Sequence, residues 1–183
     1  MSKIELLLDN YAKYIALPWQ KELAPAQRVI FCVYNEQDEL RFRLKLDEFQ
    51  LKTEQSMHNW LAIDVSKTFT SWLSKQKYKI KYFENPKLIE PAIKLFEKYL
   101  QNEVTEQISD AGIDENTVVA VHGVGALFGQ VKIKQLVELI APKVPGRLLI
   151  FFPGTYENDN YRLLNAYDGW NYLAVTITPD KNF

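Results

Sequence analysis

Hydrophobic residues gather along the chain in five short runs, and longer segments of mixed character separate most of them. Several runs are nearly continuous in Val, Ile, Leu and Phe, which is typical of strands that are covered on both faces. The runs predict strands at Arg28–Tyr34, Trp60–Val65, Thr117–His122, Arg147–Phe152 and Asn171–Ile177. Most of the intervening segments are long enough for the helical crossovers that parallel strands require.

The helical period of about 3.6 residues is clearest in residues 86–110, where apolar residues recur at this spacing and Gly112 supplies a stop signal. Similar amphipathic patterns predict helices in residues 4–15 and 130–142. The helical segments therefore alternate with the predicted strands along most of the chain.

The segment between the first two predicted strands is ambiguous. Residues 40–46 alternate like a strand, although their leucines also fit one face of a helix. We expect a helix within residues 35–55, because two parallel strands need a crossover between them. The alternation of strands and helices predicts a single α/β domain over residues 1–183. We expect a three-layer α/β/α sandwich with a mainly parallel sheet of about five strands, Rossmann-like or degenerate P-loop-like.

The composition is that of an ordinary globular protein, with 47% hydrophobic and 25% charged residues. A net charge of -1 gives the whole chain no attraction for nucleic acid or acidic lipid. Cys32 is the only cysteine, which excludes an internal disulfide, and no apolar run reaches the roughly 20 residues that span a bilayer. Because Glu5 and Asp9 interrupt the apolar N-terminal residues, unlike in a signal peptide, we expect a cytoplasmic protein without membrane contact.

A glycine-rich segment, His122–Gly129, leads from the third predicted strand toward the next helix. Glycines at such a turn let backbone N–H groups approach a phosphate. A Walker-type phosphate loop would continue with Lys and Ser or Thr, whereas Gln-Val follows here, and the last two glycines are one residue too far apart for the dinucleotide pattern. The segment favours a tight turn or a partner contact. Nucleotide binding through Gly123, Gly125 and Gly129 is the alternative.

Other catalytic patterns are incomplete. Leu61–Asp64 resembles a Walker B strand, but it precedes the glycine-rich segment instead of following it. His58 and His122 are the only histidines, and no His/Cys pair has metal-ligand spacing, so we expect no metal site. His122 at a strand end is typical of a packed residue, with a general-base role as the minor alternative. Cys32 lies within a strand, out of reach of a substrate. We therefore expect neither an enzyme nor a cofactor.

The segment Pro153–Arg162, after the fourth predicted strand, is polar and aromatic. It suits a recognition surface, because Tyr and Arg side chains dominate interface hot spots. It equally suits a hydrogen-bonded turn that leads into a short helix at Tyr161–Leu164. Both interpretations stay open, and Asp168–Gly169 marks a further turn, with Trp170 beside it.

A basic cluster with interleaved aromatic residues lies in the middle of the chain. Its members are Lys75, Lys77, Lys79, Lys81, Tyr78, Tyr82 and Phe83. Lysines contact phosphates and aromatic rings stack on bases, so the cluster is compatible with nucleic-acid binding. Alternating lysines on an exposed strand edge also protect against aggregation. The slightly negative total charge favours weak or absent contact with nucleic acid.

Several phrases, taken in order and spacing, resemble the BrxB family, small core components of BREX (bacteriophage exclusion) systems. The resemblance extends from Leu17 to Ile177, and the Phe-Pro-Gly and Asn-Tyr-Arg-Leu-Leu phrases make it specific. The phrases are Leu17–Gln20, Arg28–Phe31 with Tyr34, Val121–Gly129, Gly146–Gly154, Asn160–Leu164 and Asp168–Ala174.

The resemblance implies a role in phage defence. BREX systems protect bacteria from phage while they mark host DNA by methylation, and they combine a methyltransferase (PglX), a phosphatase-like protein (PglZ) and a large ATPase (BrxC) with small factors. No catalytic residues carry over from the family. We therefore expect an adaptor whose preferred partner is PglZ, with BrxC as the second choice. The candidate partner-binding residues are Leu127, Phe128, Tyr156, Tyr161 and Arg162.

Overall fold

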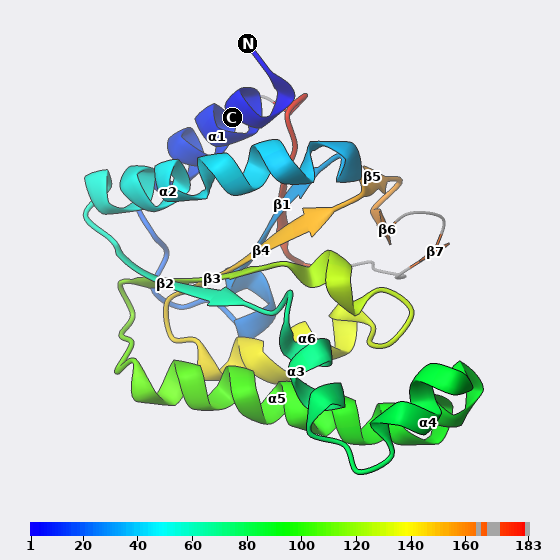
Figure 1. Cartoon of the computed structure of the whole chain (residues 1–183). Coiled ribbons are helices and arrows are strands. Elements are labelled where there is room, and N and C mark those ends of the chain that lie inside the picture. The colour runs from blue at the N-terminus through cyan, green and yellow to red at the C-terminus, as the bar shows by residue number, and fades with distance from the viewer. Residues whose placement is uncertain (164–165, 168–172, 182–183) are drawn as a thin grey trace.

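A computed structural model of the chain describes residues 1–163, 166–167 and 173–181. Its centre is a parallel sheet of five strands in the order β2-β3-β4-β1-β8 (Figure 1). These strands are β1 (Val29–Tyr34), β2 (Asn59–Asp64), β3 (Thr117–His122), β4 (Arg147–Pro153) and β8 (Val175–Ile177). The first four match the predicted strands to within one residue at each end. The fifth forms only over its last three residues, and residues 171–172 lie outside the described part.

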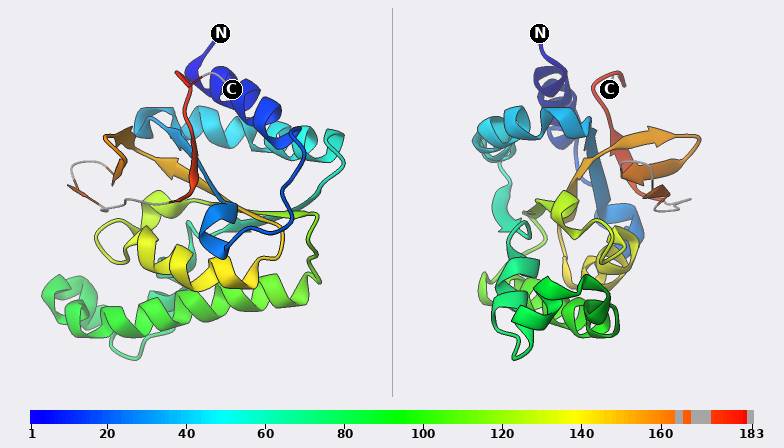
Figure 2. Two further views of the ribbon diagram at one scale, coloured as in Figure 1. Left: turned by 180° about the vertical axis from the view of Figure 1, so that it is seen from behind. Right: turned by 45° about the vertical axis from the view of Figure 1, so that its right-hand side comes forward.

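Helices cover both faces of this sheet (Figures 1 and 2). The side chains of β1 alternate between two cores, with Phe31 on one face and Cys32 on the other. The Cys32 face packs against α1 (Lys3–Ile15) and α2 (Glu39–Gln55). The Phe31 face packs against α3 (Thr68–Ser74), α5 (Ile93–Asp110) and α6 (Ile133–Ile140). The predicted three-layer α/β/α arrangement is confirmed.

Prolines explain where the helices differ from the predicted spans. The 86–110 segment begins as the 3-10 helix η3 (Pro86–Ala92), because Pro91 has no N–H for an α-helical bond, and only then continues as α5. The 130–142 segment likewise ends as η5 (Ala141–Lys143) around Pro142. The ambiguous 40–46 stretch is helical, as predicted. Three further short 3-10 helices and one α-helix are η1 (Pro25–Arg28), η2 (Glu36–Asp38), η4 (Val124–Leu127) and α4 (Lys79–Glu84).

The predicted short helix at Tyr161–Leu164 is wrong. Strands β5 (Thr155–Glu157) and β6 (Asn160–Leu163) form an antiparallel hairpin, and β7 (Ala166–Tyr167) adds a third strand. Asn158 and Asp159 at its tip have φ of 51° and 61°, the left-handed conformation of the turns that reverse a strand tightly. The chain therefore returns as a strand. Leu164 and the predicted turn at Asp168–Gly169 with Trp170 lie outside the described residues.

The strand order opens a crevice at the carboxyl ends of the sheet. From β1 the chain passes through α2 on one face to the far edge at β2, whereas β3 continues into η4 and α6 on the other face. The connections after β1 and β3, on either side of β4, therefore leave the sheet toward opposite faces and separate from each other. In open α/β sheets such a point is where ligands bind.

Candidate functional site

The register of the sheet brings the ends of four strands to one edge. Asp64 of β2 pairs with His122 of β3, and Tyr34 of β1 pairs with Pro153 of β4. A tyrosine, an aspartate and a histidine from distant parts of the sequence therefore share the carboxyl edge. This edge is the candidate site.

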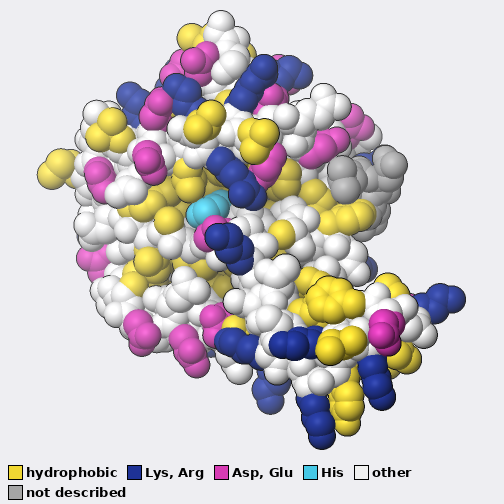
Figure 3. Space-filling view, viewed as in Figure 1, with side chains coloured by type: hydrophobic (Ala, Val, Ile, Leu, Met, Phe, Trp, Pro, Cys, Tyr) yellow, Lys and Arg dark blue, Asp and Glu magenta, His cyan; other side chains and the backbone are white. Residues whose placement is uncertain are grey.

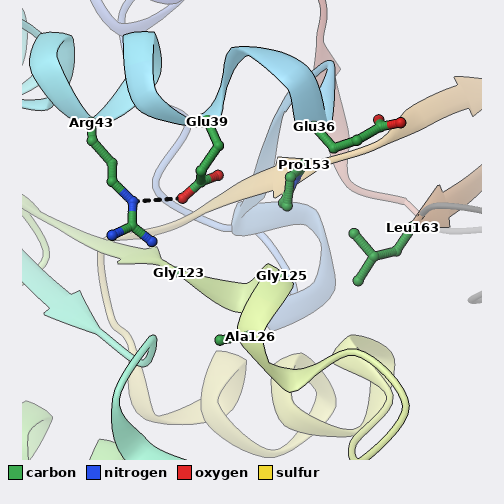
Figure 4. A pocket seen from close by; sticks show the side chains of 8 residues that line it. All are labelled: Glu36, Glu39, Arg43, Gly123, Gly125, Ala126, Pro153 and Leu163. Carbon is green, nitrogen blue, oxygen red and sulfur yellow. Dashed lines mark hydrogen bonds and ion pairs between the residues drawn. The ribbon is translucent and has the colours of Figure 1, made fainter.

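A pocket of about 220 Å³ lies at this edge, and all three layers contribute to it (Figure 4). One wall is acidic and comes from η2 and α2, the opposite wall is the glycine-rich connection after β3, and the floor and outer rim come from β4 and β6. The lining residues are Glu36, Glu39, Arg43, Gly123, Gly125, Ala126, Pro153 and Leu163. Two carboxylates and one guanidinium thus set the charge of the pocket.

Glu39 is held by partners of the chain itself. One of its carboxylate oxygens accepts a hydrogen bond from Arg43 Nε at 2.8 Å, and the other accepts one from the Tyr34 hydroxyl. Burial, and then the bond to Glu39, raise the pKa of Tyr34 far above its ordinary value, so the phenol stays protonated and donates. The Glu39 part of the acidic wall is therefore fixed by internal pairing.

Asp64 and His122 form a loose pair beside the pocket. Their Oδ1 and Nδ1 atoms are 3.7 Å apart, too far for a hydrogen bond, while the backbone N–H of Ser66 donates to Asp64 Oδ1 at 2.8 Å. Burial would raise the pKa of Asp64, but the hydrogen bonds from Ser66 and the nearby His122 and Arg43 lower it overall. Burial lowers the pKa of His122 more than Asp64 raises it.

This geometry does not form a nucleophile relay. A serine–histidine–aspartate triad places the histidine between the other two side chains. Here Ser66 bonds to Asp64, and no hydrogen bond joins His122 to a hydroxyl or thiol in the described residues. Cys32 is fully buried, and burial raises the pKa of its thiol well above the ordinary value, so it is not an available nucleophile.

The glycine-rich segment is a tight turn, as predicted. Gly123 has φ of 79°, and a Cβ at this position would lie 2.7 Å from Ser66 Cβ and 2.8 Å from Asp64 Oδ1. Gly123 and Gly125 line the pocket, whereas Gly129 is exposed and does not. The chain needs glycine at position 123 to pass this close to the end of β2.

The pocket is poorly suited to phosphate. In dinucleotide-binding domains the first strand-to-helix turn carries the glycines that bind the phosphates. The corresponding turn here, residues 35–38, has no glycine and contains Glu36 and Asp38, and Glu39 follows it. Arg43 is the only cation in the lining, and Glu39 already binds it. Phosphate oxygens would meet carboxylates on this wall.

Two of the five candidate partner-binding residues are not at the surface. Leu127 is 0% exposed, because η4 turns it into the core. Tyr161 is 3% exposed; it faces inward from β6, its ring lies 4.4 Å from that of Phe31, and its hydroxyl bonds to Thr176. The prediction that these two residues present a surface is wrong, since their inward faces complete the core.

Phe128, Tyr156 and Arg162 do reach the surface. Phe128 and Arg162 are exposed, and Tyr156 is half-buried against Tyr161 with its hydroxyl donating to Asp159 at 2.8 Å. Ala126 and Leu163 from the same two segments line one pocket, which shows that the segments are neighbours. The role of these three residues in partner binding stays a prediction.

The lysine cluster does not lie on a strand edge, which was one of its two interpretations. Residues 79–84 form α4 instead.

In the described ranges no group of three or more His, Cys, Asp or Glu side chains is arranged to hold a metal ion. Among the helices of the described chain, none is both long and apolar enough to cross a membrane.

Tyr34, Glu36, Glu39 and Arg43 were not among the predicted site residues, because they belong to no known motif. A signal for them was present. The acidic run after the first strand ends at the same sheet edge as His122, and the rule that ligands bind beyond the carboxyl ends of the strands applies to both.

Comparison with known proteins gives the family of the chain. The family model described as BREX protein BrxB matches residues 61–177, which is 117 of 183 residues. The matched range runs from β2 to β8 and includes the glycine-rich segment and the hairpin. The comparisons with curated proteins and with solved structures gave no match. Because the family model covers well over half of its length, the chain belongs to the BrxB family of BREX phage-defence proteins.

Proposed function

We propose that this protein is a non-enzymatic adaptor in a cytoplasmic BREX complex. PglZ is the preferred candidate for its partner, and BrxC is the alternative. The family match supports membership of a BREX system. The carboxyl edge of the sheet, where an α/β enzyme would carry its chemistry, supports a binding role over catalysis.

One observation carries the proposal. Two carboxylates of the crevice are bound by neighbouring groups of the chain: Glu39 by Tyr34 and Arg43, and Asp64 by Ser66. A catalytic pocket keeps donors or acceptors oriented toward the position of a substrate. Here the Glu39 contacts join α2 to the end of β1 instead, and the Ser66 bond holds Asp64 at the end of β2. They present a fixed edge to which a partner can bind without reorganising it.

The docking residues that we propose on this edge are Phe128, Tyr156 and Arg162. They come from the connection after β3 and from the hairpin after β4, and together they offer apolar, aromatic and cationic contacts. Aromatic and arginine side chains are enriched at the centres of protein interfaces. PglZ and BrxC are the larger BREX proteins against which this edge is best tested.

The test is co-expression with PglZ or BrxC, followed by size-exclusion chromatography and measurement of Kd. Phe128→Ala or Tyr156→Ala should weaken the complex by about 1 kcal/mol or more, roughly fivefold in Kd, with the fold intact. Leu44→Ala on α2 is the matched control, because this side chain is 83% exposed and belongs to neither of the two segments that carry Phe128 and Tyr156. Elution as a free protein beside both PglZ and BrxC at micromolar concentration contradicts the adaptor role.

Truncation of core aromatics gives the second control. Phe31 and Phe151 are 1% and 0% exposed, one in each core. Their replacement by Ala should cost about 3–5 kcal/mol of folding free energy and abolish binding through unfolding. Circular dichroism separates this loss from the loss of a surface contact.

A further inference from the structure

Residues 75–88 form a protrusion, here named the α4 lobe, that projects from the body of the protein beside the start of α5 (Figures 1 and 2). No residue of α4 is buried. Its large apolar side chains face outward, with Ile80 67%, Phe83 70% and Tyr78 51% exposed, and Leu88 nearby is 49% exposed. The lobe therefore presents a cluster of large apolar side chains to its surroundings, beyond the single exposed leucines that surfaces normally carry.

The lobe also concentrates positive charge in a short segment. It carries five lysines and one glutamate, a net charge of +4, so the remainder of the chain carries −5 to reach the total of −1. Figure 3 shows the hydrophobic and basic side chains gathered together on this projection. A basic rim around an apolar centre is the arrangement of a charge-steered protein interface.

The orientation of the lobe is fixed by its inner side. Tyr82 of the lobe, and Ile89 just after it, pack against the core on the Phe31 face of the sheet. Lys75 Nζ donates to the Tyr99 hydroxyl on α5 at 3.1 Å, and Lys79 Nζ donates to the Ser74 carbonyl at 3.0 Å. These contacts hold α4 with the opposite side, which contains Ile80 and Phe83, turned outward. A helix this short is only marginally stable by itself. Its exposed apolar face is therefore better explained by a binding role than by a contribution to the stability of the fold.

We propose that the α4 lobe is a second docking surface, which binds an acidic surface on a partner protein with an apolar pocket for Ile80 and Phe83. The inference rests on the proposed adaptor function and adds a contact separate from the Phe128 and Tyr156 edge. Ile80 and Phe83 are three residues apart, so they lie on the same side of the helix and enter one pocket. The lysines around them pair with Asp and Glu side chains at the rim.

The contacts of Tyr78 favour a protein partner over nucleic acid. The ammonium groups of Lys77 and Lys81 each lie 5.6 Å from the centre of the Tyr78 ring, so a base that stacked on this ring would compete with two cations. A phosphate backbone offers no apolar surface with which the exposed Ile80 side chain could pack. The charge of −5 on the rest of the chain also repels an extended polyanion.

The experiment compares two double variants with matched controls, in the complex of the full chain with whichever BREX protein co-purifies with it. Ile80→Asp/Phe83→Asp removes the apolar contact, and Leu40→Asp/Leu44→Asp is its control, since these leucines are 77% and 83% exposed on α2. Lys77→Glu/Lys81→Glu reverses the rim charge, and Lys3→Glu/Lys13→Glu does the same on exposed positions of α1. Circular dichroism confirms that each variant folds.

Both lobe variants should raise the Kd by about tenfold or more, while the control variants change it by less than about twofold. A photocrosslinker in place of Phe83 should then react with a segment of the partner rich in Asp and Glu. A complex of wild-type affinity with both lobe variants overturns the lobe inference and leaves the adaptor function standing. A wild-type chain that binds no BREX protein overturns both.

Nucleic acid is tested in the same series with a random-sequence DNA duplex in a mobility-shift assay at near-physiological salt. We expect weak, salt-labile binding at most. Tight binding of the duplex that is lost in Lys77→Glu/Lys81→Glu but retained in Ile80→Asp/Phe83→Asp would assign the lobe to DNA and refute the protein partner.

Discussion

Replacement of Gly123 by alanine gives the sharpest test of the crevice geometry. Two costs add at this position. Its φ of 79° lies in the left-handed region, which costs a non-glycine residue about 1–2 kcal/mol. The new Cβ would also lie 2.7 Å from Ser66 Cβ and 2.8 Å from the Ser66 backbone nitrogen, and such overpacking costs about 1–3 kcal/mol. Gly123→Ala should therefore destabilise the protein by roughly 2–5 kcal/mol.

Gly112 supplies the matched control. It also has a positive φ, 60°, but a Cβ built on it meets nothing within 4 Å. Gly112→Ala should therefore cost only the backbone term of about 1–2 kcal/mol. Urea unfolding followed by tryptophan fluorescence and circular dichroism measures both variants. If Gly123→Ala costs no more than Gly112→Ala, the close approach of the glycine turn to the end of β2 is not a constraint on folding.

Titration calorimetry with Mg-ATP and GTP should detect no micromolar binding, because Glu36 and Glu39 line the pocket; binding that is lost on Gly125→Asp would restore the nucleotide hypothesis. Ellman's reagent should modify Cys32 only after denaturation, because the thiol is fully buried and burial raises its pKa, and rapid reaction of the native protein would contradict this. Lowering the pH from about 7 to about 5.5 should destabilise the protein in part through His122, whose pKa burial lowers. The unfolded chain accepts this proton below about pH 6.5, whereas the folded chain resists it. Urea unfolding of His122→Asn should show a smaller loss over this range, and an unchanged loss would remove His122 as a cause.

The strands were predictable because burial on both faces leaves a strong local signal. The run from Val29 to Tyr34 is apolar at every position, and every position is buried. The α2 helix was predictable only from topology, since its sequence alternates like a strand. Its identity followed from the need for a crossover between β1 and β2.

The hairpin and the burial of two of the five candidate docking residues were not predictable, because non-local packing decides them. Nothing near Tyr161 in the sequence shows that its ring fills a space beside Phe31, from a strand far away along the chain. Asn158 and Asp159 are compatible with a helix cap as well as with a left-handed turn, and only the pairing of β5 with β6 selects the turn. The acidic wall was missed because proximity at a sheet edge depends on strand order.

That strand order also determines when the protein can fold during its synthesis. β1 lies between β4 and β8, so the strand of this sheet that is synthesised first binds two strands that follow much later. At translation rates of about 5–20 residues per second, the interval between Tyr34 and Pro153 takes roughly 6–24 seconds. Throughout that time β1 has neither of its neighbours, and its apolar residues are open to aggregation or to chaperones. A nascent BrxB chain can therefore complete its native sheet only after β4 and β8 have been synthesised.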